Sequence, residues 1–366
     1  MTAPISPSGR RQRGLTLTEL LISIAIGVLV VGALVVVYLG SRSAYRSSDS
    51  LARVQEAGRF AVEFIAQDAR MSGYMGCRSR NLTIDDETLI NITANPPIQF
   101  TGSVDGVIGF ENGALWTNPT AITRVAGDVL TLRRASGMTV GILSNSNPVA
   151  RTVTLRHNAI GLRNNDLAVL SNCERALVFR VTNSPALTGI GDFPTQLEYK
   201  ATGAGASGAA GNDTRQVPAF NLGSRAEVIR FVDVSYFIGR NPAGRPGLYR
   251  ASAGAAEELV ENVEDMDIVY GVDTTLPDRD GIIDAYLRAD QMTAANWGRV
   301  VSARISLLVV GQEERITAGR QTYAFGETGG IAGTDGDGMP NTREAPADGR
   351  LRHVFTTTVS LRNRVL

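Results

Sequence analysis

The stretch RRQRGLTLTELLISIAIGVLVVGALVVVYL, residues 10–39, decides the fold of this chain of 366 residues. A basic leader ends at Gly14, and a long apolar run follows it. One acidic residue, Glu19, stands near the start of the run, and no charged side chain occurs from Leu20 to Leu39. Because an α-helix rises about 1.5 Å per residue, about 20 such residues cross the roughly 30 Å hydrocarbon core of a bilayer. The stretch therefore predicts a membrane-spanning helix.

The flanks of this span predict its orientation. Arg10, Arg11 and Arg13 lie just before it, and the positive-inside rule keeps such residues in the cytoplasm. Everything after Leu39 is then exported. The alternative is a secretory signal peptide that is cut off. The apolar run is longer than a usual signal core, and no small-x-small cleavage site follows Leu39, so the sequence favours a retained span.

The segment from Gly14 through LTLTELLISIAIG resembles the N-terminal signature of type IV prepilins. In that family a prepilin peptidase cleaves after the glycine, the next residue becomes a methylated N-terminus, and a glutamate stands fifth in the mature chain. The resemblance implies cleavage between Gly14 and Leu15, although phenylalanine is commoner than leucine at that position. It also implies that Glu19 pairs with the terminal ammonium of a neighbouring subunit, so that neither charge is buried alone. The simpler alternative is that Glu19 reaches water at the cytoplasmic interface.

Composition excludes several functions. Lys plus Arg and Asp plus Glu both number 36, which gives no reason to expect a nucleic-acid partner. The 39 glycines and 6% aromatic residues suit an exported, loop-rich β protein. The two histidines, His157 and His353, lie far in sequence from any cysteine or carboxylate cluster. No nucleophile elbow and no phosphate-binding loop is present, so we expect no enzyme.

Beyond the span, helical periodicity continues. Gly73 and Gly76 predict a helix end near Met71. We therefore expect one long helix whose first half lies in lipid and whose second half packs on a sheet. The apolar residues at helical spacing are Leu51, Val54, Ala61, Phe64 and Ile65.

Short alternating runs then predict β-strands. The segment 258–273 is compatible with a strand or with a short helix followed by a strand, and 201–213 is predicted to be a flexible loop. The fold class is thus α+β, with a mostly antiparallel sheet domain. Its parts would be a leader (1–14), a transmembrane half-helix (15–39), an amphipathic half-helix (40–72) and an exported domain (73–366). The predicted strands cover 127–136, 151–158, 167–183, 226–240, 246–252, 299–312 and 351–363.

Cys77 and Cys173 are the two cysteines, and in an exported chain they suggest one disulfide. The alternative is a pair of free buried thiols. The segments ARMSGYMGC and SNCERALVFRVT look like the cysteine pair of PilW-type minor pilins. The closing VFTTTVSLRNR is similar to the last strand of that family and of the type II secretion pseudopilins.

Two Asp-rich segments, 273–286 and 333–344, are candidate calcium loops. In the EF-hand register the first segment lacks both end ligands. Its YGVD start, Tyr270 to Asp273, matches a strand that precedes an Asp/Gly-rich turn in PilW-type proteins. Polar turns are the favoured interpretation of both segments, so no cofactor is expected other than a possible calcium ion. The candidate ligands are Asp278, Asp280, Asp284, Asp335 and Asp337.

The resemblance implies a minor pilin that waits in the inner membrane with its C-terminal domain in the periplasm. It would join a type IV pilus, or the complex that initiates one, by packing of N-terminal helices. Other minor pilins, a major pilin and prepilin peptidase would be its partners. Two alternatives stay open: a type II secretion pseudopilin, and a membrane-tethered adhesin that binds through the 201–213 loop and the Asp-rich turns.

Overall fold

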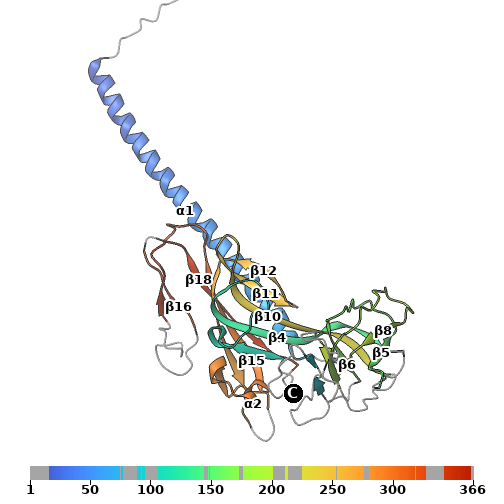
Figure 1. Cartoon of the computed structure of the whole chain (residues 1–366). Helices are drawn as coiled ribbons and strands as arrows, with labels where there is room; N and C mark the ends of the chain where they lie inside the picture. The colour runs from blue at the N-terminus through green and yellow to red at the C-terminus, as the bar shows by residue number, and fades with distance from the viewer. Residues whose placement is uncertain are drawn as a thin grey trace, which may run out of the picture. The chain divides into compact units, whose positions relative to one another are not determined.

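A computed structural model describes most of the chain, and it comprises two compact units, residues 1–52 and residues 53–366 (Figure 1). The described residues are 16–74, 76, 89–91, 93–94, 106–143, 147, 149–172, 176–200, 211–212, 225–252, 254–275, 280–317, 319–326 and 342–363.

The first unit consists of the first part of helix α1, which spans Leu17–Met71 over 55 residues. Leu, Ile, Val and Ala fill the segment up to Leu39. Within the described residues, α1 is the one helix long and apolar enough to cross a membrane.

The last part of α1, from Arg53 on, packs inside the second unit. Val54, Ala61 and Ile65 recur at helical spacing and are buried in its main hydrophobic core. Gly58 lies against the ring of Phe355, and a Cβ atom at this position would overlap that ring. The helix ends at Met71, as the sequence predicts.

The larger sheet of the second unit is built around strand β10 (Glu227–Arg240). One edge of β10 pairs with β4 (Arg124–Gly141), and the other pairs first with β6 and then with β11. Its order is β1-β7-β6-β10-β11-β12, with β3 beyond β4, and all pairs are antiparallel except β1 with β7. The remaining bounds are β1 Leu89–Asn91, β3 Val107–Phe110, β6 Leu167–Ser171, β7 Ala176–Arg180, β11 Pro246–Ser252 and β12 Ala255–Glu261.

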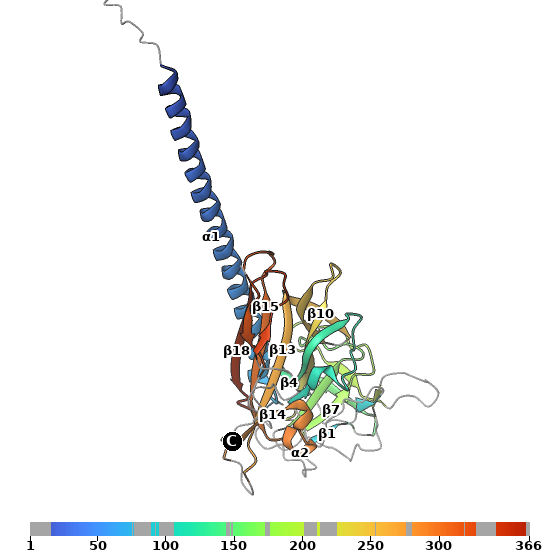
Figure 2. The same cartoon turned by 90° about the vertical axis from the view of Figure 1, so that its left-hand side faces the viewer.

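A second, wholly antiparallel sheet has the order β14-β13-β15-β18. Figure 2 shows β13, β15 and β18 side by side. Strand β15 is an apolar run because it is buried almost throughout. The bounds are β13 Val263–Val272, β14 Ala285–Arg288, β15 Val300–Val310 and β18 Arg352–Ser360.

Smaller elements complete the second unit. Three two-stranded sheets pair β2 with β9, β5 with β8 and β16 with β17. Their bounds are β2 Thr93–Ala94, β5 Thr152–Leu155, β8 Thr195–Glu198, β9 Gly211–Asn212, β16 Thr322–Ala324 and β17 Thr342–Glu344. The short helices are η1 Glu111–Gly113, η3 Ala289–Gln291 and α2 Ala294–Trp297.

The second unit contains separate hydrophobic cores. The main core joins α1 from Val54 on to inward residues of both large sheets, such as Tyr236 and Ile305. Another core is formed by residues between Val140 and Val228, with Phe179 against Tyr199 at 5.3 Å between ring centroids. Residues 140–228 therefore form a lobe with a hydrophobic core of its own.

The structure corrects two sequence predictions and decides between the two alternatives for segment 258–273. The run 167–183 is not one strand but the antiparallel pair β6 and β7. The segment 258–273 holds the end of β12 and all of β13, without a helix. Within the predicted loop 201–213, Gly211 and Asn212 form β9, which pairs with β2. The Asn212 side-chain amide also exchanges hydrogen bonds with the Arg180 backbone. The other residues of that loop lie outside the described ones.

Candidate functional site

The N-terminus of α1 carries the acidic residue that the sequence singles out. Thr16 precedes the helix, and the Glu19 carboxylate accepts from the Thr16 backbone N–H at 3.0 Å and from its hydroxyl at 2.9 Å. The Glu19 N–H donates back to the Thr16 hydroxyl at 3.4 Å. This reciprocal capping box satisfies backbone donors that the first helical turn leaves unpaired. Glu19 is therefore held at the helix start and remains exposed.

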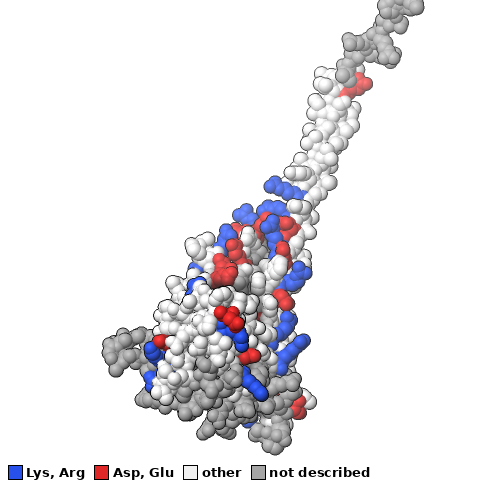
Figure 3. Space-filling view, turned by 90° about the vertical axis from the view of Figure 1, so that its right-hand side faces the viewer, with Lys and Arg blue, Asp and Glu red and all other residues white. Residues whose placement is uncertain are grey.

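The helix surface that follows Glu19 is apolar on every side. Figure 3 shows this part of α1 as an almost uncharged rod. Every residue from Leu17 to Tyr38 is exposed in this single chain, and Leu29, for example, is 73% exposed. An apolar surface of this extent marks a membrane or protein contact. The most exposed large side chains are Leu17, Ile22, Val28, Leu29, Leu34, Val36, Val37 and Tyr38.

The two predicted processing residues, Gly14 and Leu15, lie outside the described residues, which begin at Thr16. The capping box therefore starts one position after the predicted new N-terminus.

The predicted disulfide partners, Cys77 and Cys173, also lie outside the described residues. Residues close to each cysteine in the sequence contact the same strand, β10. The Cα of Gly76 is close enough to Ile229 of β10 that a Cβ there would lie 2.7 Å from the Ile229 side chain. Ser171 pairs with Glu227 of the same strand. The two chain segments that lead to the cysteines thus both approach the start of β10.

The first Asp-rich segment is the connection of a β-hairpin between β13 and β14. The Asp284 carboxylate accepts from the N–H of Thr274 at 2.6 Å and from its hydroxyl at 3.0 Å. These hydrogen bonds lower the pKa of Asp284. Asp280 accepts from the N–H of Ile282 at 2.9 Å, and buried Asp273 accepts from the N–H of Gly281 at 2.8 Å. The described carboxylates therefore stabilise a polar turn.

The other calcium candidates, Asp278, Asp335 and Asp337, lie outside the described residues. Among the residues that the structure describes, no three His, Cys, Asp or Glu side chains lie together as metal ligands would.

A buried polar cluster around Asp68 fixes α1 to the larger sheet, and the sequence analysis missed it. The Asp68 carboxylate accepts from Tyr236 Oη at 2.7 Å, Arg134 Nη2 at 2.9 Å and Arg250 Nε at 3.1 Å. Burial alone would raise the pKa of Asp68, but the Tyr236 hydroxyl and the two guanidinium groups outweigh it and lower the pKa. The available signal was a lone carboxylate three residues after Ile65 on the apolar face.

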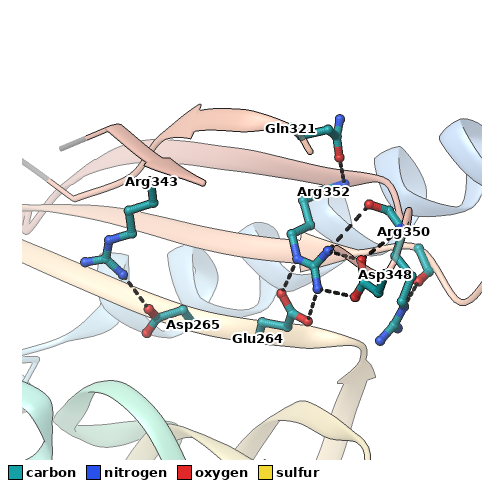
Figure 4. Close-up of polar contacts among 8 residues, drawn as sticks. Glu264, Asp265, Gln321, Arg343, Asp348, Arg350 and Arg352 are labelled. Carbon is teal, nitrogen blue, oxygen red and sulfur yellow. Dashed lines mark hydrogen bonds and ion pairs between the residues drawn. The ribbon is translucent and has the colours of Figure 1, made fainter. Parts of the chain in front are cut away.

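Arg352 is the centre of a second polar cluster, in the smaller sheet (Figure 4). Its guanidinium donates two hydrogen bonds to Glu264, at 2.7 and 2.9 Å, and two to Asp348, both at 2.8 Å. Its backbone N–H donates to Gln321 Oε1 at 2.8 Å. Because bidentate pairs fix geometry as well as charge, Arg352 ties the chain before β18 to β13.

Two family models match parts of the chain. Residues 235–363 match the family model of type IV pilus-assembly protein W, and residues 9–35 match the prokaryotic N-terminal methylation motif. A search of curated proteins finds no match. Among solved structures, the type IV-like pilin TTHA1219 from Thermus thermophilus is similar at 20% identity. The alignment covers 37% of this chain and 70% of that one, with a TM-score of 0.20.

A methylation motif at the head of a long apolar helix, followed by a mostly antiparallel β domain, defines a type IV pilin-like protein. This chain carries both features, and residues 235–363, which match the protein W model, are called its PilW region below. That region runs from the second half of β10 through β18. It therefore includes Tyr236, which donates to Asp68 in the first polar cluster, and Arg352, the centre of the second.

Proposed function

We propose that this chain is a minor pilin that enters a type IV pilus, or the complex that initiates one, through its N-terminal helix. Prepilin peptidase would cleave after Gly14, and Leu15 would become the methylated N-terminus. Until assembly, the span would hold the subunit in the inner membrane with the β domain in the periplasm. Other minor pilins and a major pilin would be its partners, and its role would be structural rather than enzymatic.

One observation carries this proposal: an apolar helix, exposed on every side, begins with a single carboxylate held at its first turn. In lipid the apolar side chains are solvated by acyl chains, and in a fibre they would be covered by neighbouring helices. Glu19 would be costly in an apolar fibre unless an ammonium group paired with it. The terminal amine of an adjacent subunit would supply that cation, which sets the register between helices.

Two measurements test the proposal. Mass spectrometry of the native protein should show an N-terminus at methyl-Leu15. Purified fibres should contain the unchanged chain but not the Glu19→Gln variant, which keeps a hydrogen-bonding side chain and loses the charge. A native N-terminus beyond residue 39, or full incorporation of Glu19→Gln, would contradict it.

A second candidate function is ligand recognition by the lobe around residues 140–228. This lobe has its own core, lies outside the PilW region and displays apolar side chains, with Ile190 82% and Phe193 55% exposed. Large exposed apolar side chains of this kind can contact a ligand. Changing Ile190 and Phe193 to Ser in the full chain should then reduce cell or matrix binding without reducing fibre incorporation. Unchanged binding would exclude these side chains from that role.

A further inference from the structure

A group of aromatic and basic side chains follows the apolar run of α1. We call this group the collar. It consists of four exposed residues of α1, namely Tyr38, Arg42, Tyr45 and Arg46. Tyr38 and Tyr45 are 65% and 74% exposed, although tyrosine rings are usually at least partly covered. Tyrosine and arginine side chains each have an apolar part and a polar end, so the collar is suited to a boundary between an apolar layer and an anionic layer.

The spacing of the collar brings its members together. Tyr38, Arg42 and Tyr45 stand at positions i, i+4 and i+7, so they share one helix face. Arg46 follows Arg42 by four residues and is its neighbour on the next turn. An anion that lies between them can therefore accept hydrogen bonds from both guanidinium groups.

The position of the collar along the helix indicates which anion it meets. At about 1.5 Å per residue, Arg42 lies roughly 4.5 Å and Arg46 roughly 10 Å beyond Leu39. The headgroup layer extends about 5–7 Å beyond each side of the hydrocarbon core. Helical side chains slant toward the N-terminus, which here means back toward the bilayer. Both guanidinium groups can therefore reach the phosphate layer, while tyrosine is the residue enriched at this boundary.

We propose that the collar binds the phosphate groups of phospholipids in the outer leaflet and thereby fixes the depth of α1 in the membrane. This inference rests on the proposed membrane anchoring. The planar guanidinium of arginine can donate two hydrogen bonds to the oxygens of one phosphate group, and the tyrosine rings would pack along the acyl-glycerol boundary. Asp49, one turn beyond Tyr45 on the same face, would repel phosphate and so limits the site on its aqueous side. A subunit that leaves the bilayer for a fibre must release these phosphates.

Lipid selectivity of the reconstituted full chain tests the collar. The chain would be placed in dioleoylphosphatidylcholine vesicles that contain trace spin-labelled phosphatidylglycerol or, in a parallel sample, spin-labelled monogalactosyldiacylglycerol, which has no phosphate. Electron spin resonance measures how much of each lipid is immobilised by the protein. The variant is Arg42→Gln with Arg46→Gln. The matched control is Arg53→Gln with Arg59→Gln, which removes the same charge from exposed positions farther along α1.

We expect the unchanged chain to prefer the phosphate lipid, and the preference to fall by about fivefold or more in the collar variant, because both guanidinium groups that would bind the phosphate are removed. The control should keep the preference. The leader arginines are the same in all three chains and contribute equally. Equal immobilisation of both lipids by the unchanged chain, or equal loss in the control, would overturn the collar alone. No immobilised lipid of either kind would overturn membrane anchoring and the collar together.

Discussion

Thr16 and Glu19 cap the first turn of α1 reciprocally: each side chain accepts a hydrogen bond from the backbone N–H of the other residue. The capping function needs only oxygen acceptors, whereas pairing with an ammonium needs a full negative charge. Glu19 thus has two separable properties, one local to its own helix and one that would act between subunits.

Substitutions can separate these properties. Thr16→Val removes the hydroxyl and should weaken the first helical turn by about 1 kcal/mol, yet fibre incorporation should persist because the charge of Glu19 remains. Glu19→Gln should preserve the cap and abolish incorporation. Amide hydrogen exchange of the N-terminal residues, measured beside the subunit content of purified fibres, checks both. If Thr16→Val were excluded from fibres as completely as Glu19→Gln, the cap rather than the charge would be the decisive feature.

The Asp68 cluster leads to a prediction about stability. Asp68→Asn would leave Arg134 and Arg250 without the carboxylate that both contact. Removing one member of a buried ion pair typically costs about 3–5 kcal/mol, so the free energy of unfolding should fall by about 3 kcal/mol or more. Urea unfolding of the full chain in detergent measures it. Glu63→Gln, which removes the exposed pair with Arg70, is the control and should cost at most about 1 kcal/mol.

The long helix and most strands could be predicted from local sequence. The glycines after Met71 indicate where α1 ends. Runs rich in β-branched and apolar residues indicate the strands β10, β11 and β15, which are largely buried. The sequence does not indicate that 167–183 contains two strands, because no Gly or Pro lies between them. Segment 258–273 was ambiguous for a similar reason, since Asn262 alone separates β12 from β13, at a φ of 61°.

The polar clusters could not be predicted because their members are distant in sequence. Asp68 meets Tyr236 and Arg250, which are 168 and 182 residues away. Arg352 meets Glu264 across 88 residues. Nothing in the local pattern specifies such pairs; only the sheet order brings them together. At the N-terminus, in contrast, Thr16 and Glu19 are three residues apart, and a T-x-x-E pattern is readable as a cap.

Acid should weaken the smaller sheet through Asp348. Hydrogen bonds from Arg352 lower the pKa of Asp348 from 3.8 to about 2. A carboxylate with a lowered folded-state pKa stabilises the fold above its unfolded value and loses that contribution as pH falls through the folded value. Stability should therefore fall between about pH 4 and pH 2, and Asp348→Asn should flatten this part of the profile. Thermal unfolding against pH measures it, with Asp192→Asn, an exposed ion-pair residue, as control.

At Gly127, the backbone of β4 in the larger sheet lies very close to the backbone of β13 in the second sheet. Its φ is +67°, and a Cβ there would lie 2.6 Å from the backbone N and O atoms of Met266 in β13. Gly127→Ala should thus cost about 3 kcal/mol from the left-handed backbone and from displacement of β13. Gly137 lies in the same strand, and a Cβ atom added there would have no neighbour within 4 Å, so Gly137→Ala should change stability little. Chemical unfolding of both variants checks this, and equal stabilities would contradict the predicted close approach.

The proposed bridge between Cys77 and Cys173 makes the last prediction. The segments leading to both cysteines approach the start of β10, and a bridge would close a loop of 173 − 77 = 96 residues. The chain-entropy model assigns roughly 4–5 kcal/mol to a loop of this length. Cys77→Ser should therefore destabilise the exported protein by several kcal/mol, and the double variant with Cys173→Ser should cost little more. Mass measurement with and without reductant gives the direct test: two alkylated thiols in unreduced, exported protein would rule out the bridge.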